Sequence, residues 1–91
     1  MIGKLFEIIE DRKNNPVVHS YTNSLFESGY DRVAQKVGEE AVEVIIAAGK
    51  HGHQRTIEEA ADLIYHLFVL LVQQGISLAE IEAELESRHS Q

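Results

Sequence analysis

The segment from Leu63 to Val72 is apolar almost all the way round, and it constrains the fold more than any other part of the chain. It is too short to span a membrane and begins directly after an acidic residue, Asp62, so we predict no membrane segment. A helix that is apolar on every side must be covered on every side. The short helices of a 91-residue chain can hardly provide this cover alone. We therefore expect a homodimer or higher oligomer with helix-bundle packing.

The single proline and six glycines divide the chain into helical segments, and we find no pattern typical of a strand. Asn14-Asn15-Pro16 ends the first helix, and Ser77-Leu78-Ala79-Glu80 is a capping box that opens the last one. Ser20-Tyr21-Thr22 is either the start of a short helix or a polar binding loop. The expected helices cover about residues 4–13, 20–27, 31–50, 55–74 and 77–88. We predict one all-α domain over residues 1–91, a small bundle of about five helices completed by dimerisation.

Charge and composition exclude several classes of protein. Fifteen acidic residues against eight basic ones give a net charge of -7, which argues against a nucleic-acid binder. A phosphate-bearing substrate would need metal ions or a few well-placed basic residues to approach this chain. The absence of cysteine excludes disulfides and zinc-thiolate sites. The N-terminus lacks the layout of a signal peptide, so we expect a soluble cytoplasmic protein.

Two acidic motifs carry the chemistry, Glu39-Glu40-x-x-Glu43 and Glu59-x-x-Asp62. Residues three or four apart share one face of a helix, so within each motif like charges repel and weaken the helix. A bound cation would remove this repulsion, and sites made only of oxygen ligands suit Mg²⁺, Ca²⁺ or Mn²⁺.

The acids of the first motif lie along the edge of an apolar stripe on the long helix 31–50. The expected stripe consists of Val33, Val37, Ala41, Val44 and Ala48. If this helix and the next pack antiparallel, both motifs come to one level and present four carboxylates to one pocket. Those four are Glu40, Glu43, Glu59 and Asp62.

Other interpretations of these acids stay open. Each carboxylate taken alone is typical of a solvated helix face. Thr56-x-x-Glu59 could be a capping box that turns Glu59 toward its own backbone, unless the helix begins at Gln54 or Gly52. A di-iron bundle requires Glu-x-x-His, but Leu63 occupies the position three residues before His66.

The histidines and basic residues also allow more than one role. His66 follows Asp62 by four residues, so it is either a buried imidazole hydrogen-bonded to Asp62, a residue that orients a ligand acid, or a substrate contact. Lys36 either pairs with Glu39 or Glu40, or contacts phosphate. His51 and His53 are more typical of a solvated loop. The candidates for phosphate or carboxylate binding are Arg12, Lys13, Arg32, Arg55 and Arg88.

Two stretches resemble the phosphoribosyl-ATP pyrophosphohydrolase family: residues 36–43, Lys-Val-Gly-Glu-Glu-Ala-Val-Glu, and residues 58–67, Glu-Glu-Ala-Ala-Asp-Leu-Ile-Tyr-His-Leu. This family belongs to the all-α nucleotide pyrophosphohydrolases of the MazG and all-α dUTPase-like superfamily. Glu-x-x-Glu followed by Glu-x-x-Asp marks the superfamily. Three further motifs narrow the resemblance to this family: Ser20-Tyr21-Thr22, Lys-x-Gly-Glu-Glu-Ala and Asp-Leu-x-Tyr-His. The resemblance extends over nearly the whole chain.

The resemblance implies the second step of L-histidine biosynthesis, in which phosphoribosyl-ATP and water give phosphoribosyl-AMP and pyrophosphate. It makes Mg²⁺ the expected cofactor, with Mn²⁺ as a substitute, and a separate cyclohydrolase the enzyme that acts on the product. Its implied Mg²⁺ ligands are Glu40, Glu43, Glu59 and Asp62. Glu39 and Glu58 are implied as second-metal or water-activating groups, and Lys36 as a group that steadies the outgoing charge. The implied substrate-binding residues are Arg12, Ser20, Tyr21, Thr22, His66 and Arg88.

Two alternatives to this function remain. A house-cleaning nucleoside triphosphate pyrophosphohydrolase would use the same metal site with a different pocket. A non-catalytic dimerisation bundle would carry the same acids as ordinary surface charges. Ser20-Tyr21-Thr22 and His66 favour the histidine-pathway enzyme.

Overall fold

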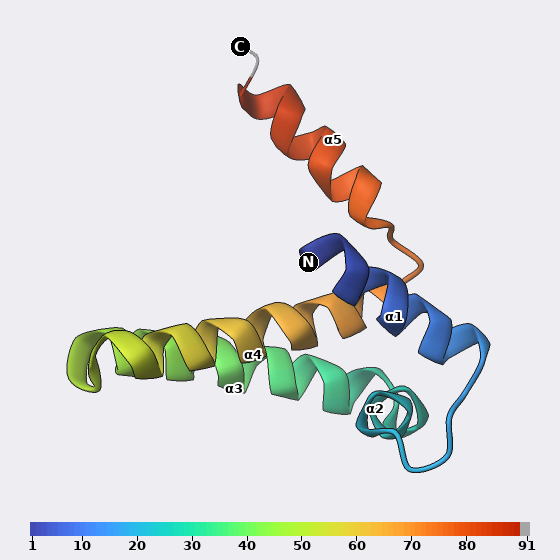
Figure 1. Ribbon diagram of the computed structural model, residues 1–91, viewed down its shortest axis with the longest axis horizontal. Coiled ribbons are helices and arrows are strands. Elements are labelled where there is room, and N and C mark those ends of the chain that lie inside the picture. The colour runs from blue at the N-terminus through green and yellow to red at the C-terminus, as the bar shows by residue number, and fades with distance from the viewer. Residues whose placement is uncertain (90–91) are drawn as a thin grey trace.

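The computed structural model describes residues 1–89, so residues 90 and 91 of the expected domain lie outside the described residues. The described chain is all α-helical, as predicted, and contains no strand (Figure 1). Its five helices are α1 (Ile2–Asn14), α2 (Tyr21–Ser28), α3 (Tyr30–Lys50), α4 (Gly52–Gln73) and α5 (Leu78–His89). The largest difference from the prediction is that α4 begins at Gly52 rather than at Arg55.

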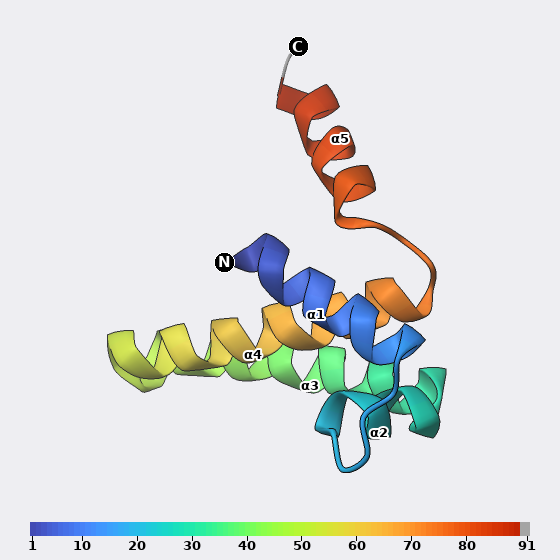
Figure 2. The same ribbon diagram turned by 45° about the vertical axis from the view of Figure 1, so that its right-hand side comes forward.

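Helices α3 and α4 form a long antiparallel hairpin that turns at His51 (Figures 1 and 2). Gly52 has φ +84°, a conformation that glycine adopts at no steric cost, and this allows α4 to begin directly after the turn. Helix α1 lies across the half of α4 that is farther from the turn, and α2 packs near the start of α3 (Figure 2). The hairpin therefore has a covered end and an open end at the turn.

The apolar core fills the covered end of the hairpin. Phe6 of α1 meets Phe68 of α4 edge-on, with ring centroids 5.1 Å apart. Val33 of α3 and Val69 of α4 are fully buried beside Ile9 of α1. The complete core cluster is Phe6, Ile9, Leu25, Val33, Phe68, Val69 and Val72.

The buried face of α3 differs from the expected stripe. Val33, Glu40 and Ala47 are buried, whereas Ala48 is exposed. Residues seven apart lie within about 20° of one another around a helix, so these three form one line that faces α4. Glu40 therefore lies at the centre of the buried face and not along its edge, which corrects the prediction.

Helix α5 stands apart from the other four (Figures 1 and 2). The predicted capping box is present, since Ser77 N–H donates to Glu80 Oε2 at 2.7 Å and Glu80 N–H donates to Ser77 Oγ at 3.2 Å. Hydrogen bonds from Ser77 lower the pKa of Glu80, and the bond from its backbone N–H has the largest effect. No side chain of α5 is buried. Leu78 at the start of α5 packs against the core, whereas Leu85 farther along the helix is exposed.

Within residues 1–89, no helix on its own has both the length and the apolar character needed to cross a membrane. Helices α4 and α5 meet that criterion only as a pair, bent by 108°.

Candidate functional site

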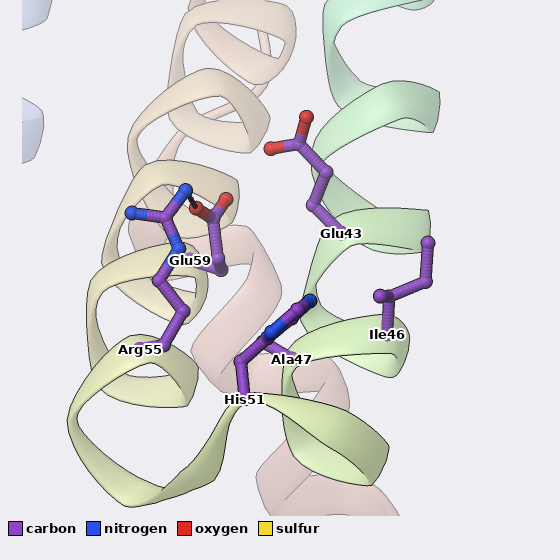
Figure 3. A pocket seen from close by; sticks show the side chains of 6 residues that line it. All are labelled: Glu43, Ile46, Ala47, His51, Arg55 and Glu59. Carbon is purple, nitrogen blue, oxygen red and sulfur yellow. Dashed lines mark ion pairs between the residues drawn. The ribbon is translucent and has the colours of Figure 1, made fainter.

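Three carboxylates from both acidic motifs meet in the open half of the hairpin. Glu40 and Glu43 of α3 and Glu59 of α4 each place one oxygen within 4.8 Å of the others. Glu43 and Glu59 both lie eight residues from His51 (51 − 43 and 59 − 51), so the antiparallel turn brings them level. Their carboxylates face each other across the two helices in Figure 3. We call Glu40, Glu43 and Glu59 the carboxylate cluster.

Two members of the carboxylate cluster are buried with one oxygen unsatisfied. Glu40 is 6% exposed and Glu59 is 4% exposed. Glu40 Oε1 pairs with Lys36 Nζ at 3.2 Å, and Glu59 Oε1 pairs with Arg55 at 2.7 Å. The Oε2 atoms of both residues are buried without a hydrogen-bond partner in the described chain. Buried charged oxygens are costly unless something satisfies them, and an oxygen-only set of this kind fits Mg²⁺ or Mn²⁺.

Asp62, the fourth expected ligand, lies outside the carboxylate cluster. Its side chain is exposed, and its backbone carbonyl accepts a hydrogen bond from His66 Nδ1 at 2.8 Å. Asp62 and Glu40 are both eleven residues from His51 (62 − 51 and 51 − 40), so they are level on the hairpin. The described structure thus brings three of the four expected carboxylates together, and the fourth stands one helical turn away on α4.

Glu59 faces α3 because of where its helix begins. Helix α4 starts at Gly52, and the Thr56 hydroxyl donates to the Gly52 carbonyl at 2.7 Å in the helix interior. The capping-box interpretation of Thr56 and Glu59 is therefore wrong, and the alternative start at Gly52 is correct.

Glu39 and Glu58 are exposed at the margins of the site. Glu39 accepts a hydrogen bond from Gln35 at 3.0 Å. Glu58 accepts one from Arg55 at 3.3 Å and one from Gln54 at 3.3 Å. Both carboxylates lie next in sequence to a buried member of the carboxylate cluster but point to solvent.

Lys36 pairs with both acids on its own helix face. It lies 3.2 Å from Glu40 and 3.9 Å from Glu39. The hydrogen bond to Glu40 is the largest cause that raises the pKa of Lys36, although burial of the ammonium group opposes it. Lys36 is therefore charged at neutral pH and offsets part of the negative charge of the site.

His66 is buried one helical turn after Asp62 and joins α4 to α2. Its Nδ1 donates to the Asp62 carbonyl, and its Nε2 is hydrogen-bonded to the Tyr21 hydroxyl at 3.1 Å. The Thr22 hydroxyl bonds to the Tyr65 hydroxyl, and the rings of Tyr21 and Tyr65 stack at 6.2 Å. Burial is the main cause that raises the pKa of Tyr65. His66 is thus a hydrogen-bonded buried histidine, but its partner is the backbone of Asp62 and not the carboxylate.

Ser20-Tyr21-Thr22 divides into a cap and two contact residues. Ser20 is the N-cap of α2, and its hydroxyl accepts from Asn23 N–H at 3.3 Å. The segment is therefore a helix start, and it also presents Tyr21 and Thr22 to α4.

Arg12 and Arg88 have partners on their own helices. Arg12 lies 3.4 Å from Asp11, and Arg88 lies 3.0 Å from Glu84. Helix α5, which carries Arg88, points away from the hairpin (Figure 1). Within one chain, Arg88 is therefore separated from the carboxylate cluster.

A pocket of about 450 Å³ opens between α3 and α4 at the turn of the hairpin. Its wall is formed by Glu43, Ile46, Ala47, His51, Arg55 and Glu59 (Figure 3). We call it the turn pocket. Arg55 was one of the five basic candidates for phosphate or carboxylate binding, whereas His51 was expected in a solvated loop. The spacing of four residues between Arg55 and Glu59 was the available signal for Arg55.

Comparison with known proteins gives consistent matches. Residues 2–89 match the phosphoribosyl-ATP pyrophosphohydrolase family. A phosphoribosyl-ATP pyrophosphatase of Clostridium acetobutylicum is 51% identical over 89 residues, which cover 98% of this chain and 81% of that protein. Another from Listeria welshimeri is 51% identical over 88 residues, with 97% and 84% covered. The histidine biosynthesis bifunctional protein HisIE of Caldanaerobacter subterraneus is 52% identical over 89 residues, which cover 98% of this chain and 43% of that protein.

Proposed function

Because the chain belongs to the phosphoribosyl-ATP pyrophosphohydrolase family, we infer that it hydrolyses phosphoribosyl-ATP to phosphoribosyl-AMP and pyrophosphate. This reaction is the second step of L-histidine biosynthesis, and the chain is a hydrolase of that pathway. The observation that carries this conclusion is the match over residues 2–89, together with identities above one half across nearly the whole chain.

We propose that the carboxylate cluster holds the Mg²⁺ on which the reaction depends, with Mn²⁺ as a substitute. The unsatisfied buried oxygens of Glu40 and Glu59 support this proposal, because a divalent cation would satisfy both. Asp62 is the fourth proposed ligand on the strength of the family resemblance. A bound cation neutralises phosphate charge and makes a water molecule more acidic.

The chain's own residues have separate tasks in this proposal. Lys36 keeps its positive charge beside Glu40 and offsets the charge of the departing pyrophosphate. Glu39 and Glu58 have exposed oxygens beside the carboxylate cluster and could accept a proton from the attacking water.

We further propose that substrate binds on the side of the hairpin where α2 meets α4. Tyr21 and Thr22 of α2 and His66 of α4 are proposed contacts there, because Tyr21 bonds to His66 and Thr22 bonds to Tyr65 on α4. Ser20 acts through the cap of α2. Arg12 and Arg88 are proposed phosphate contacts, and Arg88 would need a different placement of α5 or a second chain to reach the site.

A homodimer or higher oligomer is the proposed assembly. The chain exposes 6254 Å² and has a radius of gyration of 14.4 Å. A compact monomer of 10.2 kDa would expose about 5300 Å² and have a radius of about 12 Å. The hairpin also exposes apolar side chains, namely Val42, Ile45, Ile46, Ile57, Ile64 and Leu67. A monomer in sedimentation experiments at micromolar concentration would contradict this assembly.

The cellular setting is proposed from the pathway. The bifunctional relative is named for histidine biosynthesis and is more than twice as long as the matched region. We propose that a cyclohydrolase acts on the product of this chain, and that both activities work in the cytoplasm.

The decisive experiment measures pyrophosphate release from phosphoribosyl-ATP with and without Mg²⁺. We expect rapid release that requires the cation and is suppressed by a chelator. The same assay with dCTP and dUTP tests the house-cleaning alternative, and equal rates on these nucleotides would overturn the assignment. Absence of turnover, together with no change in melting temperature on adding Mg²⁺ or Mn²⁺, would favour a non-catalytic bundle.

A further inference from the structure

Arg55 connects an exposed cation to a buried acid. Its side chain is 57% exposed, yet its guanidinium lies 2.7 Å from the buried Glu59 and 3.3 Å from the exposed Glu58. The second oxygen of Glu59 has no partner in the described chain. Arg55 therefore neutralises Glu59 from the solvent side, and Glu59 is also a proposed metal ligand.

The turn pocket places opposite chemistries side by side. Glu43 and Glu59 supply cation-binding oxygens, while Arg55 and His51 supply nitrogen groups that can bind an anion. In Figure 3 the guanidinium lies beside the Glu59 carboxylate, and the His51 ring points into the space between the helices. A pocket with this lining suits a phosphate group that is bound both through a metal ion and by an arginine.

We propose that Arg55 is a displaceable counter-ion that pairs with Glu59 when no metal is bound and binds the pyrophosphate group when a divalent cation is on Glu59. The inference rests on the proposed metal site and identifies the turn pocket as the pyrophosphate subsite. A divalent cation on Glu59 repels the guanidinium, and the mostly exposed Arg55 side chain can move without disturbing the core. The planar fork of arginine fits two phosphate oxygens, and this makes pyrophosphate a suitable second partner.

The first measurement compares Mn²⁺ binding by the full-length wild type and by Arg55→Gln, followed by electron paramagnetic resonance without any phosphate compound. Removing the competing cation should make Mn²⁺ bind up to about fivefold more tightly, as expected for loss of an ion pair with one exposed partner. The second measurement follows inorganic pyrophosphate binding in saturating Mg²⁺ by calorimetry. There Arg55→Gln should bind pyrophosphate about tenfold more weakly or worse, because a charge-assisted bond is lost.

Opposite signs in the two assays identify the exchange, since damage to the fold would weaken both. Lys50→Gln is the matched control, because it removes one positive charge at the same end of the hairpin but outside the turn pocket. We expect it to change neither affinity by more than about twofold. Arg55→Lys should restore part of the pyrophosphate affinity.

The outcomes separate this inference from the metal assignment. If the wild type binds Mn²⁺ but Arg55→Gln changes neither affinity, or lowers both, the role of Arg55 is refuted and the carboxylate site stands. An equal shift in Lys50→Gln would also refute it, because the effect would then be general electrostatics. If the wild type binds no Mn²⁺, both the metal site and the counter-ion role fall.

Discussion

The two halves of the α3–α4 hairpin bury side chains to a similar degree, but one half buries apolar side chains and the other buries carboxylates. In the covered half, Val33 and Val69 are fully buried against α1. In the half near the turn, Glu40 and Glu59 are buried almost as deeply. Val33 and Glu40 even lie on the same line of α3, seven residues apart. Backbone packing therefore decides which positions are buried, and the residue type decides whether burial stabilises the fold or leaves carboxylate oxygens without a partner.

The energetic consequences follow from that difference. Burying apolar surface stabilises a protein by roughly 25 cal/mol per Å², and this gain needs no further partner. Burying a carboxylate costs free energy unless a cation and hydrogen bonds compensate it. Lys36 and Arg55 compensate one oxygen each, and the second oxygen of each carboxylate has no partner in the described chain. Substitutions in the two halves should thus have opposite effects on stability and activity.

The largest effect is expected at the carboxylate half. Glu59→Gln should lower turnover of phosphoribosyl-ATP by at least about a hundredfold, since even indirect partners of a metal cost up to that factor. The melting temperature of the metal-free protein should stay the same or rise, because a charge leaves a repelling cluster. Pyrophosphate release and thermal denaturation with a chelator measure the two quantities.

Asp62→Asn tests the fourth proposed ligand in the same assay, with a similar loss of turnover expected. Glu82→Gln is the control for both variants, because it removes one exposed acid on α5. Full activity in Glu59→Gln would contradict the assignment of the metal site to this half.

The covered half should show the reverse pattern. Ile9→Val removes one methylene from a side chain that is 1% exposed, and we expect a loss of about 1 kcal/mol in the free energy of unfolding. Mn²⁺ affinity should not change. Urea denaturation and metal titration measure these, with the exposed Ile2→Val as the control. A change in Mn²⁺ affinity without a change in the free energy of unfolding would contradict the assignment of metal binding to one half and stability to the other.

Tyr21 lies at the boundary between the two halves and should affect both moderately. Tyr21→Phe removes the hydroxyl that bonds to His66 but keeps the ring that stacks on Tyr65. Loss of one hydrogen bond corresponds to about fivefold in kcat/KM if the bond positions His66 for substrate. Steady-state kinetics measure it, and Tyr30→Phe, an exposed residue at the start of α3, is the control. An unchanged kcat/KM would limit His66 to a structural role.

Local sequence chemistry predicted the helices well because their ends are determined locally. The Asn-Asn-Pro stop, the glycines and the capping box at Ser77 and Glu80 act within a few residues of each boundary. The meeting of both acidic motifs was also predictable, since it needs only helical spacing and an antiparallel turn.

The remaining features depend on contacts between distant residues. Which face of α3 is buried, with Ala47 inside and Ala48 outside, is set by how α4 crosses it. The bond between Tyr21 and His66 joins residues 45 apart in sequence, which no local pattern indicates. The exposure of Asp62 likewise follows from the rotation of α4 about its own axis.

The smallest effect concerns the pH dependence of the carboxylate half. The hydrogen bond to Glu40 raises the pKa of Lys36 above its usual value of 10.5 in the folded protein. Because the pKa of Lys36 is higher in the folded than in the unfolded protein, the ion pair contributes its full stability at pH values below the pKa of the unfolded protein. This contribution is lost as pH rises through the pKa of the folded protein. Lys36→Gln should therefore be less stable than the wild type at neutral pH, by less than about 1 kcal/mol, and the difference should shrink above pH 10.5.

Burial also raises the pKa of Tyr65, so the stability that this residue contributes is likewise lost as pH rises. Only the difference in stability between the wild type and Lys36→Gln therefore isolates the ion pair. Urea denaturation of the metal-free proteins from neutral pH to above pH 10.5 measures that difference. Lys4→Gln on α1 is the control, because Lys4 is exposed near the covered half and its removal should have no comparable pH dependence. A difference that stays constant through the alkaline range would mean that Lys36 stabilises the hairpin by packing. The carboxylate half would then lack the pH dependence that distinguishes it from the apolar half.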